Sequence, residues 1–595
     1  MDYYGLMVST LRNWRLALIS ALVLGTLPAW AQETSPLLNA TTEAAMPSQT
    51  AEVSALNAEL FYDLLVGEIS AAQGDSTNAV ALLMEAARQS QSQQLYQRAA
   101  EIALQSRSGQ RALVVANEWQ QNFPQSRDAN RYLLQILLML NRVSESQDAL
   151  SREVAWMPST AKSASYLAIA QLYSRVTDKS LAAAVVEQAL QPDLQDAKVA
   201  PAAWATIGHM RIAANQKDLA LQALAHAHAQ GPREAATALL ALELMEAGQP
   251  QAEAMAQDYL RDAPAPTIQM AYASVLMSQN RMNDAQKQLT PLLKANPDMA
   301  DAWMLQASLY AQKTQWNNAQ QALQRLESLL AQIPEQAQRD YALAQAYLLS
   351  GRISLQQKDY AQALLSLEKI PNGANALNVQ SLKAMALAKQ GKLAHGRAVI
   401  RAIPANGTEQ SLQKRQAEVA LLRNNGAPQE AYLLQRTLYE QFPENTDIAY
   451  ETAILAERAG KMDAMEKILR DIIAQHPEHR HALNALGYSY ADRGIRLPEA
   501  KALIEMALQQ APNDPFITDS LAWVEFRLGN TSKALELLDA IYAEHKDVEI
   551  AAHLGEVLWS SGHQDRARSI WRQALEQDAD NDILRATLER LQVKP

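Results

Sequence analysis

The segment 482–494, ALNALGYSYADRG, ends in a glycine that recurs through the C-terminal part of the chain at nearly constant spacing. A glycine that follows a helix can adopt left-handed backbone angles without the steric cost that a side chain adds. Each glycine of the series is therefore expected to form the turn between two helices. The five glycines, which recur about every 34 residues, are Gly426, Gly460, Gly494, Gly529 and Gly562.

Small residues and prolines keep the same period. A small residue lets two helices approach closely, and a proline ends the second helix of a pair because it cannot continue it. A small residue follows most of the glycines after five or six residues, and a proline follows the first three; they are Ala431, Ala500, Ala534 and Ala567, and Pro443, Pro477 and Pro512. Helical hairpins that repeat about every 34 residues are the tetratricopeptide pattern.

The register continues upstream, where asparagine, the next-best residue for a left-handed turn, replaces glycine at several positions. We therefore expect an all-α fold, a right-handed superhelical solenoid of about fifteen tetratricopeptide-like hairpins between Leu56 and Leu591. The composition agrees, because Ala, Leu and Gln are abundant and only five residues are Phe, so no sheet is expected. The upstream turn residues are Gly74, Asn141, Asn215, Gly248, Asn280 and Gly391.

One interval breaks the rhythm. The expected turns near Thr314 and Lys358 are separated by about ten residues more than one repeat. We place an internal boundary in this interval. It divides the solenoid into an N-terminal array over residues 56–330 and a C-terminal array over residues 331–595, which ends in a capping helix.

The N-terminus has the ordered parts of a secretory signal peptide. Arg12 and Arg15 precede an apolar run, and Ala29-Trp30-Ala31 forms the cleavage site. We expect residues 1–31 to be removed and residues 32–55, rich in Thr, Ser and Ala, to form a flexible linker. One alternative to a cleaved signal peptide is an uncleaved membrane anchor, but the apolar run is short for a membrane-spanning helix. Another is that translation starts at Met7.

The mature chain is therefore expected in the periplasm, with no transmembrane segment. The net charge of −11 offers no basic stripe for a phosphate backbone, which argues against nucleic acid as a partner. The chain has no cysteine, so it lacks disulfides, thiolate metal ligands and the cysteine that anchors a lipoprotein.

The search for catalytic motifs favours a protein that is not an enzyme and that binds no cofactor or metal. The repeats leave almost no room for an enzyme domain, and the phosphate-binding, zinc-protease, nucleophile-elbow and calcium-loop patterns are missing from the sequence. The two S-x-x-K matches, at Ser366 and Ser411, lack the companion motifs of penicillin-binding proteins. The histidine cluster His476, His479 and His481 spans a loop between repeats and the start of the next helix, and it is interpreted as a solvated loop and not as a metal site. An enzyme site built within the repeats remains the alternative.

The first helices of stacked hairpins are expected to line a concave groove, which is the usual binding surface of a solenoid. Aromatic residues flanked by arginines and acids are typical of interaction hot spots. Packing against neighbouring or capping helices is the alternative for Trp523, Phe526 and Trp559. The groove residues predicted by counting back from the turns are Tyr450, Arg458, Asn484, Tyr488, Asp492, Asp519, Trp523, Phe526, Arg527, Glu556 and Trp559.

Three stretches carry a closer resemblance: LFYDLLVGE at 60–68, RAAEIAL at 98–104, and the C-terminal run that includes 482–494, DSLAW at 519–523 and AAHLGEVLW at 551–559. They resemble the large envelope tetratricopeptide proteins of proteobacteria, often outer-membrane lipoproteins, one of which binds a carboxyl-terminal processing protease. The resemblance implies an adaptor that presents substrates such as cell-wall hydrolases to a periplasmic protease.

This chain departs from the lipoprotein members because no cysteine follows its signal peptide. A tether to the outer membrane, and any function that depends on it, is therefore not implied. A scaffold for an envelope assembly or a polysaccharide-export complex is the alternative within the same class of protein-binding functions.

Overall fold

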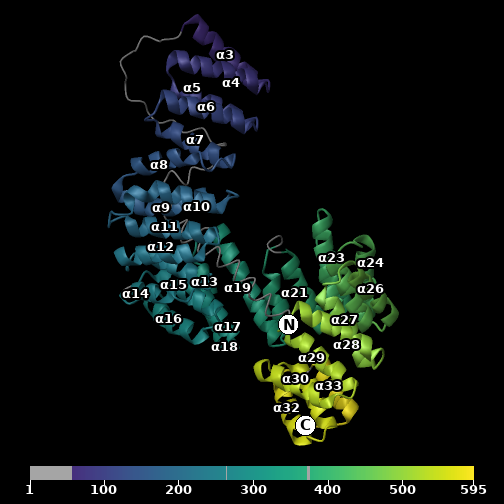
Figure 1. Cartoon of the computed structure of the whole chain (residues 1–595). Coiled ribbons are helices and arrows are strands. Elements are labelled where there is room, and N and C mark those ends of the chain that lie inside the picture. Colours follow the sequence, from purple (N-terminus) through teal and green to yellow (C-terminus); the bar gives the residue numbers. More distant parts are fainter. Residues whose placement is uncertain (1–56, 263, 335, 372–375, 580) are drawn as a thin grey trace. The chain divides into compact units, whose positions relative to one another are not determined.

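The computed structural model describes residues 57–595 except 263, 335, 372–375 and 580. Its regular structure is helical, with no strand among these residues, and the helices run from α3 to α33 (Figure 1). The expected all-α solenoid is confirmed, since the described residues form 31 α-helices, which correspond to fifteen pairs and a final helix. The predicted signal peptide and linker, residues 1–55, lie outside the described residues.

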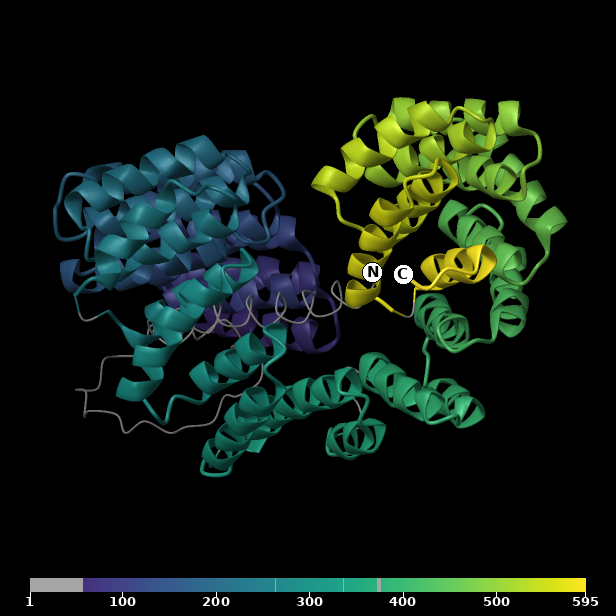
Figure 2. The same ribbon diagram turned by 90° about the horizontal axis from the view of Figure 1, so that it is seen from below.

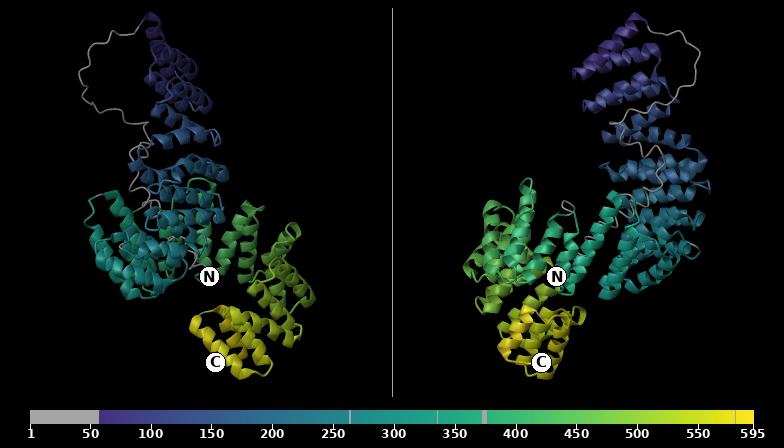
Figure 3. Two further views of the ribbon diagram at one scale, coloured as in Figure 1. Left: turned by 60° about the vertical axis from the view of Figure 1, so that its left-hand side comes forward. Right: turned by 180° about the vertical axis from the view of Figure 1, so that it is seen from behind.

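The chain divides into two compact units, Met1–Ile333 and Pro334–Pro595. Successive helices of the first unit stack beside one another, as both views in Figure 3 show. The helices of the first unit are α3 (Ala58–Ala72), α4 (Ser76–Ser90), α5 (Gln93–Gln105), α6 (Gly109–Asn122), α7 (Arg127–Met139), α8 (Ser146–Trp156), α9 (Ser159–Leu172), α10 (Lys179–Leu190), the 3-10 helix η1 (Gln191–Asp193), α11 (Ala200–Ala213), α12 (Lys217–Gln230), α13 (Ala235–Glu246), α14 (Ala252–Leu260), α15 (Pro266–Ser278), α16 (Met282–Ala295), α17 (Ala300–Gln312) and α18 (Trp316–Leu330).

In the second unit, the light-green and yellow hairpins follow one another in a curved row (Figure 2). Its helices are α19 (Gln336–Gln356), α20 (Tyr360–Glu368), α21 (Ala376–Lys389), α22 (Leu393–Arg401), α23 (Thr408–Arg423), α24 (Pro428–Gln441), α25 (Thr446–Arg458), α26 (Met462–Gln475), α27 (Arg480–Arg493), α28 (Leu497–Gln510), α29 (Pro515–Arg527), α30 (Thr531–Glu544), α31 (Val548–Ser560), α32 (Gln564–Gln577) and α33 (Asp582–Leu591).

The extra residues of the irregular interval extend a helix. At 21 residues, α19 is longer than its neighbours, and it begins just after the division between Ile333 and Pro334. The boundary expected from the sequence, after residue 330, lies slightly before this division.

The turns use the residues expected from their backbone angles. Gly494 has a φ of 67°, and Asn141, Asn215 and Asn280 have φ values between 56° and 60°, all in the left-handed region. Arg496, next to the inserted residue before Leu497, also lies there, with a φ of 47°. Because single residues carry these angles, each helix can end and the chain can reverse within a few residues.

Close approach between paired helices explains the small residues inside them. A Cβ atom placed on Gly555 of α31 would lie 2.2 Å from Nε1 of Trp571 on α32. Trp571 itself is fully buried. Any side chain at Gly555 would therefore push the two helices of this hairpin apart.

Among the described residues, no helix combines the length and the hydrophobicity needed to cross a membrane. The cores consist mainly of Ala, Leu and Ile side chains, with buried aromatics such as Trp523 and Trp571, and neighbouring hairpins share them, as expected for a repeat array.

Candidate partner-binding groove

The first helices of the last four hairpins, α25, α27, α29 and α31, carry equivalent residues at matching places along the helix. Their numbers differ by 34, 35 and 34, because one residue is inserted before α28. One row comprises Tyr450, Asn484, Asp519 and His553; the second, one helical turn later, comprises Ile454, Tyr488, Trp523 and Val557. The third, another turn later, comprises Arg458, Asp492, Arg527 and Ser561, the last of which is the C-cap of α31.

His553 connects three of the predicted groove residues. Its Nδ1 lies 2.7 Å from Oδ2 of Asp519, and its Nε2 lies 3.2 Å from the hydroxyl of Tyr488. The indole of Trp523 stacks on the imidazole, with ring centroids 4.5 Å apart and planes at 23°. One imidazole therefore links α27, α29 and α31. Counting back from the turns gave no role to His553, although it occupies the same place in its repeat as Asp519 does in the preceding one.

The carboxylates around His553 favour its charged form. Burial by itself lowers the pKa of the imidazole, but the charge of Asp519, its hydrogen bond, and the more distant Glu556 and Glu549 raise the pKa above its usual value. For Tyr488, burial acts in the opposite direction and raises the pKa of the hydroxyl, so the phenol is neutral at physiological pH. The raised pKa favours the imidazolium form of His553, with the Asp519 carboxylate beside one ring nitrogen and the Tyr488 phenol beside the other.

Three of the predicted groove residues are not at the surface. Trp523 is 2 % exposed, Glu556 4 % and Asp519 6 %. Glu556 accepts a hydrogen bond from Arg590 of α33 at 2.5 Å, so the last helix is tied to α31. A partner at the surface cannot reach these three side chains in this conformation, and they join helices to one another instead.

The other aromatic residues also pack, though less completely. Phe526 is half-buried beside Trp523, with centroids 5.5 Å apart. Trp559 is half-buried between Trp571 and the guanidinium of Arg568, which lies 5.1 Å from its ring centroid. The alternative interpretation, that these aromatics pack against neighbouring helices, therefore agrees with the full burial of Trp523 and with the partial burial of Phe526 and Trp559.

The exposed part of the predicted site is the third row. Arg458, Asp492 and Arg527 are all exposed. Arg527 donates a hydrogen bond to the backbone carbonyl of Asp492 at 3.0 Å, and its guanidinium lies 5.9 Å from the Trp523 ring centroid. In the first two rows, Tyr450, Asn484 and Tyr488 are half-buried. The third row therefore presents exposed charges of both signs, and one of them, Arg527, lies over the packed Trp523 ring.

Two histidines of the predicted cluster, His479 at the N-cap of α27 and His481 within α27, lie near Tyr450. Nδ1 of His479 accepts a hydrogen bond from the backbone N–H of Ala482 and so caps α27. The rings of His479 and His481 lie 5.7 and 6.2 Å from that of Tyr450. Over the described part of the chain, no group of three or more His, Asp or Glu side chains is placed to hold a metal ion.

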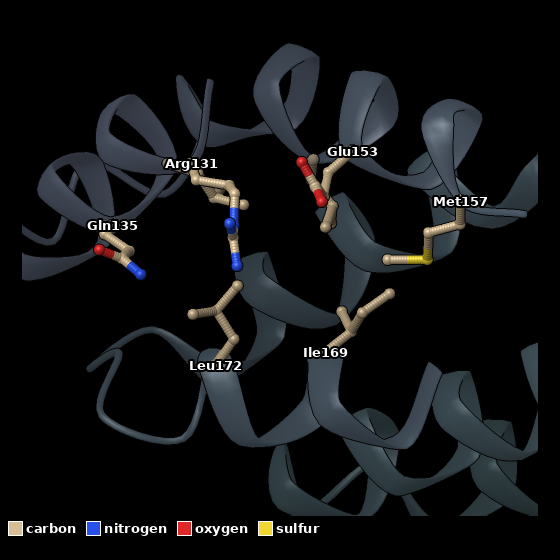
Figure 4. Close-up of a pocket in the computed structure, with 8 residues that line it drawn as sticks. Arg131, Gln135, Glu153, Met157, Ile169 and Leu172 are labelled. Atoms are coloured by element: carbon tan, nitrogen blue, oxygen red, sulfur yellow. The ribbon is translucent and has the colours of Figure 1, made fainter. Parts of the chain in front are cut away.

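A small cavity in the first unit lies between α7, α8 and α9 (Figure 4). Its volume is about 20 Å³, room for roughly one water molecule. A pocket for a small substrate usually has a volume of at least about 300 Å³. The cavity is therefore a packing gap; it is lined by Arg131, Leu134, Gln135, Leu150, Glu153, Met157, Ile169 and Leu172.

Three segments of the chain match the tetratricopeptide repeat family: residues 271–337, 450–515 and 520–582. The last two contain every predicted groove residue except Asp519, which lies between them. These three segments are therefore similar to tetratricopeptide repeats, which generally form protein-interaction scaffolds.

Two curated relatives are similar over part of their length. A TPR repeat-containing protein of Pseudomonas aeruginosa is 31% identical over 246 residues, 41% of this chain and 42% of the relative. The cellulose synthase operon protein C of Pseudomonas fluorescens is 24% identical over 328 residues, 53% of this chain and 25% of the relative. The chain thus spans less than half of the length of either relative.

Two solved structures are also similar. The APC/C hetero-tetramer Cut9–Hcn1 matches with 14% identity and a TM-score of 0.31, over 90% of this chain and 96% of that chain. A tetratricopeptide repeat protein from Parabacteroides merdae matches with 16% identity and a TM-score of 0.33, over 42% of this chain and 98% of that chain.

Proposed function

We propose that this chain is a non-catalytic periplasmic scaffold that binds a protein partner along its last four hairpins. The observation that carries the proposal is the packed cluster of Tyr488, Trp523 and His553 beside the exposed charges of the third row. A surface that is already ordered loses little conformational entropy when a partner binds. Exposed arginines such as Arg458 and Arg527 are typical of binding hot spots.

The Asp519–His553–Tyr488 chain has the residue types of an acid–base relay, but its geometry supports a structural role. Both ring nitrogens of His553 are engaged by protein groups, and Trp523 covers one face of the ring. His553 is only 3 % exposed, so a substrate has no direct access to it. A general base must lie within hydrogen-bond reach of the proton that it removes.

The partner proposed first is a carboxyl-terminal processing protease of the periplasm, for which this chain would act as an adaptor that presents cell-wall hydrolases. The support is the resemblance of segments 60–68, 98–104 and 482–494 to envelope tetratricopeptide proteins, together with the predicted signal peptide. If residues 1–31 are removed, the intact mass of the protein purified from a periplasmic fraction will correspond to a chain that begins at Gln32.

The adaptor role is tested by mixing the purified protein with such a protease and measuring both complex formation by gel filtration and the rate of hydrolase cleavage. Arg527→Glu reverses a charge in the exposed row and is expected to weaken the complex. Lys467→Glu makes the same change on an exposed position of α26, outside the row, and is the control. If the wild-type protein forms no complex and does not alter cleavage, the adaptor role is excluded.

A second candidate function rests on the similarity to the cellulose synthase operon protein C. It is a scaffold for an envelope assembly or a polysaccharide-export complex. Affinity capture from an envelope fraction, followed by mass spectrometry, distinguishes the two candidates. Recovery of the protease supports the adaptor, whereas recovery of membrane export components with wild type but not with Arg527→Glu supports the second candidate.

A further inference from the structure

The first described helix, α3, is apolar on the side that faces solvent. Phe61 is 53 % exposed, Tyr62 61 %, Leu65 48 % and Ile69 46 %. The opposite side of the same helix, which includes Leu60 and Gly67, is buried against α4. Both sides of α3 therefore carry side chains that are suited to an interface.

The exposed stripe lies where a preceding hairpin would stack. Gly67 packs against Leu83 of α4 as Gly487 packs against Ile504 of α28, so the two glycines are equivalent. This alignment places Tyr62 and Ile69 at the positions of Ala482 and Ser489, which are buried inside the array, and Leu65 at that of Ala485, which is half-buried. Phe61 aligns with His481, which is exposed. End repeats of a solenoid usually carry a polar outer face. On α3 this face is instead occupied by large apolar side chains.

We propose that this face binds the same face of a second copy of the chain, with the two α3 helices antiparallel about a two-fold axis at Leu65. Three of the four stripe residues, Phe61, Leu65 and Ile69, are symmetric around Leu65, and the fourth, Tyr62, falls opposite Glu68. Ala58 would lie opposite Ala72 of the second copy, Phe61 opposite Ile69, and Leu65 opposite itself. A two-fold interface requires this kind of self-complementary pattern, because each residue must suit its symmetry partner.

The charges beside the stripe are compatible with a second copy. Glu68 is paired with Arg98 of α5 through two hydrogen bonds of 2.8 Å, so its negative charge is compensated within its own chain. In the antiparallel arrangement Tyr62 lies opposite this ion pair, where its hydroxyl can form a hydrogen bond. Two copies therefore approach without bringing uncompensated carboxylates together at the middle of the helix.

The area indicates a reversible dimer. Four half-exposed side chains of this size present roughly 400 Å² per copy, or about 800 Å² for a pair. Stable interfaces usually bury about 1,200–2,000 Å² in total. The dimer is therefore expected to dissociate on dilution.

Disulfide cross-linking tests the geometry, because the chain has no cysteine of its own. Under mild oxidation, Leu65→Cys is expected to form a covalent dimer, since the two thiols meet at the axis. Ala58→Cys and Ala72→Cys are expected to cross-link when mixed but not separately. Leu433→Cys, at a position of α24 that is 57 % exposed, measures collisional cross-linking.

Sedimentation velocity across a concentration series provides the second measurement. The wild-type protein is expected to shift from monomer to dimer as its concentration rises. Leu65→Glu is expected to remain monomeric, and Leu433→Glu to behave like wild type, with unchanged circular dichroism in both. The proposal is overturned if the wild-type protein stays monomeric, or if Leu65→Cys cross-links no faster than Leu433→Cys. In that case the exposed face of α3 is an interface for residues 32–56 or for another protein, and not for a second copy.

Discussion

His553 and Asp519 form a buried ion pair, 2.7 Å between Nδ1 and Oδ2, that joins α31 to α29 one repeat apart. Replacing the imidazole with the neutral amide in His553→Gln keeps some hydrogen bonding but removes the positive charge. Breaking a buried ion pair typically costs about 3–5 kcal/mol. Because Gln can still hydrogen-bond, we expect His553→Gln to lower the stability of the second unit by about 3 kcal/mol.

The stabilisation by His553 is expected to depend on pH. Its pKa is raised in the folded protein, so the contribution is fully present below the pKa of the unfolded chain, about 6.5, and is lost as the pH rises through the folded-state pKa. Thermal unfolding at pH 6 and pH 9 measures this. The difference in melting temperature between wild type and His553→Gln should be larger at pH 6, and equal differences at the two pH values would contradict the assignment.

Substitutions of Trp523 and Arg527 distinguish an effect on stability from an effect on partner binding. Trp523 is buried, so Trp523→Ala is expected to leave a cavity and cost about 3–5 kcal/mol, measured as a lower melting temperature. Arg527→Glu is expected to change stability by less than about 0.5 kcal/mol, because the side chain is exposed. A Trp523→Ala protein that melts like wild type yet fails to bind its partner would show that the indole contacts the partner directly.

Gly555 tests the close contact between α31 and α32. Gly555→Ala places a methyl group 2.2 Å from the Trp571 indole and is expected to destabilise the hairpin by about 1–3 kcal/mol. Gly562→Ala is a useful comparison, because that turn has a φ of 89° but nothing within 4 Å of the added Cβ atom. Its cost should come from the backbone alone, about 1 kcal/mol. The melting temperatures of the two variants measure the difference, and equal losses would argue against the steric explanation.

The contribution of Glu525 to the stability of the fold is expected to be lost in acid. Its side chain is fully buried, with the ammonium groups of Lys501 and Lys533 at 2.9 and 3.1 Å from Oε1. Burial raises the pKa of this carboxyl, but hydrogen bonds from Lys501, Asn530 and Lys533 outweigh that effect and lower it to about 2. Its contribution, on the order of 2–3 kcal/mol, is therefore present above the unfolded pKa of about 4.5 and is lost as the pH falls towards 2.

Urea unfolding of wild type and Glu525→Gln at pH 7 and pH 3 checks this contribution. Glu525→Gln should be clearly less stable than wild type at pH 7, and the difference in the free energy of unfolding between the two proteins should be smaller at pH 3. Glu505→Gln on α28 is the control, because that carboxylate is exposed and lies 3.8 Å from the same Lys501. A gap that stays constant with pH would mean that the loss comes from packing and not from charge.

The sequence by itself determined the repeat and its turns. A period of about 34 residues, with glycine or asparagine at many of the turns, leaves the chain few alternatives to stacked helical hairpins, because local backbone preferences and apolar spacing agree. For that reason turn positions such as Asn141 and Gly494 could be assigned from the sequence alone, and so could the irregular interval that contains α19.

Only the tertiary structure decided which side chains of the predicted groove are accessible. Equivalent positions on neighbouring helices share one sequence pattern, yet Arg527 is exposed whereas Trp523, one turn before it, is buried and stacked on an imidazole from the next repeat. Burial depends on which atoms the adjacent hairpin brings close, and no local spacing in the sequence reveals the contact between Trp523 and His553. The role of His553, and the uncovered apolar face of α3, become visible only when the hairpins are stacked.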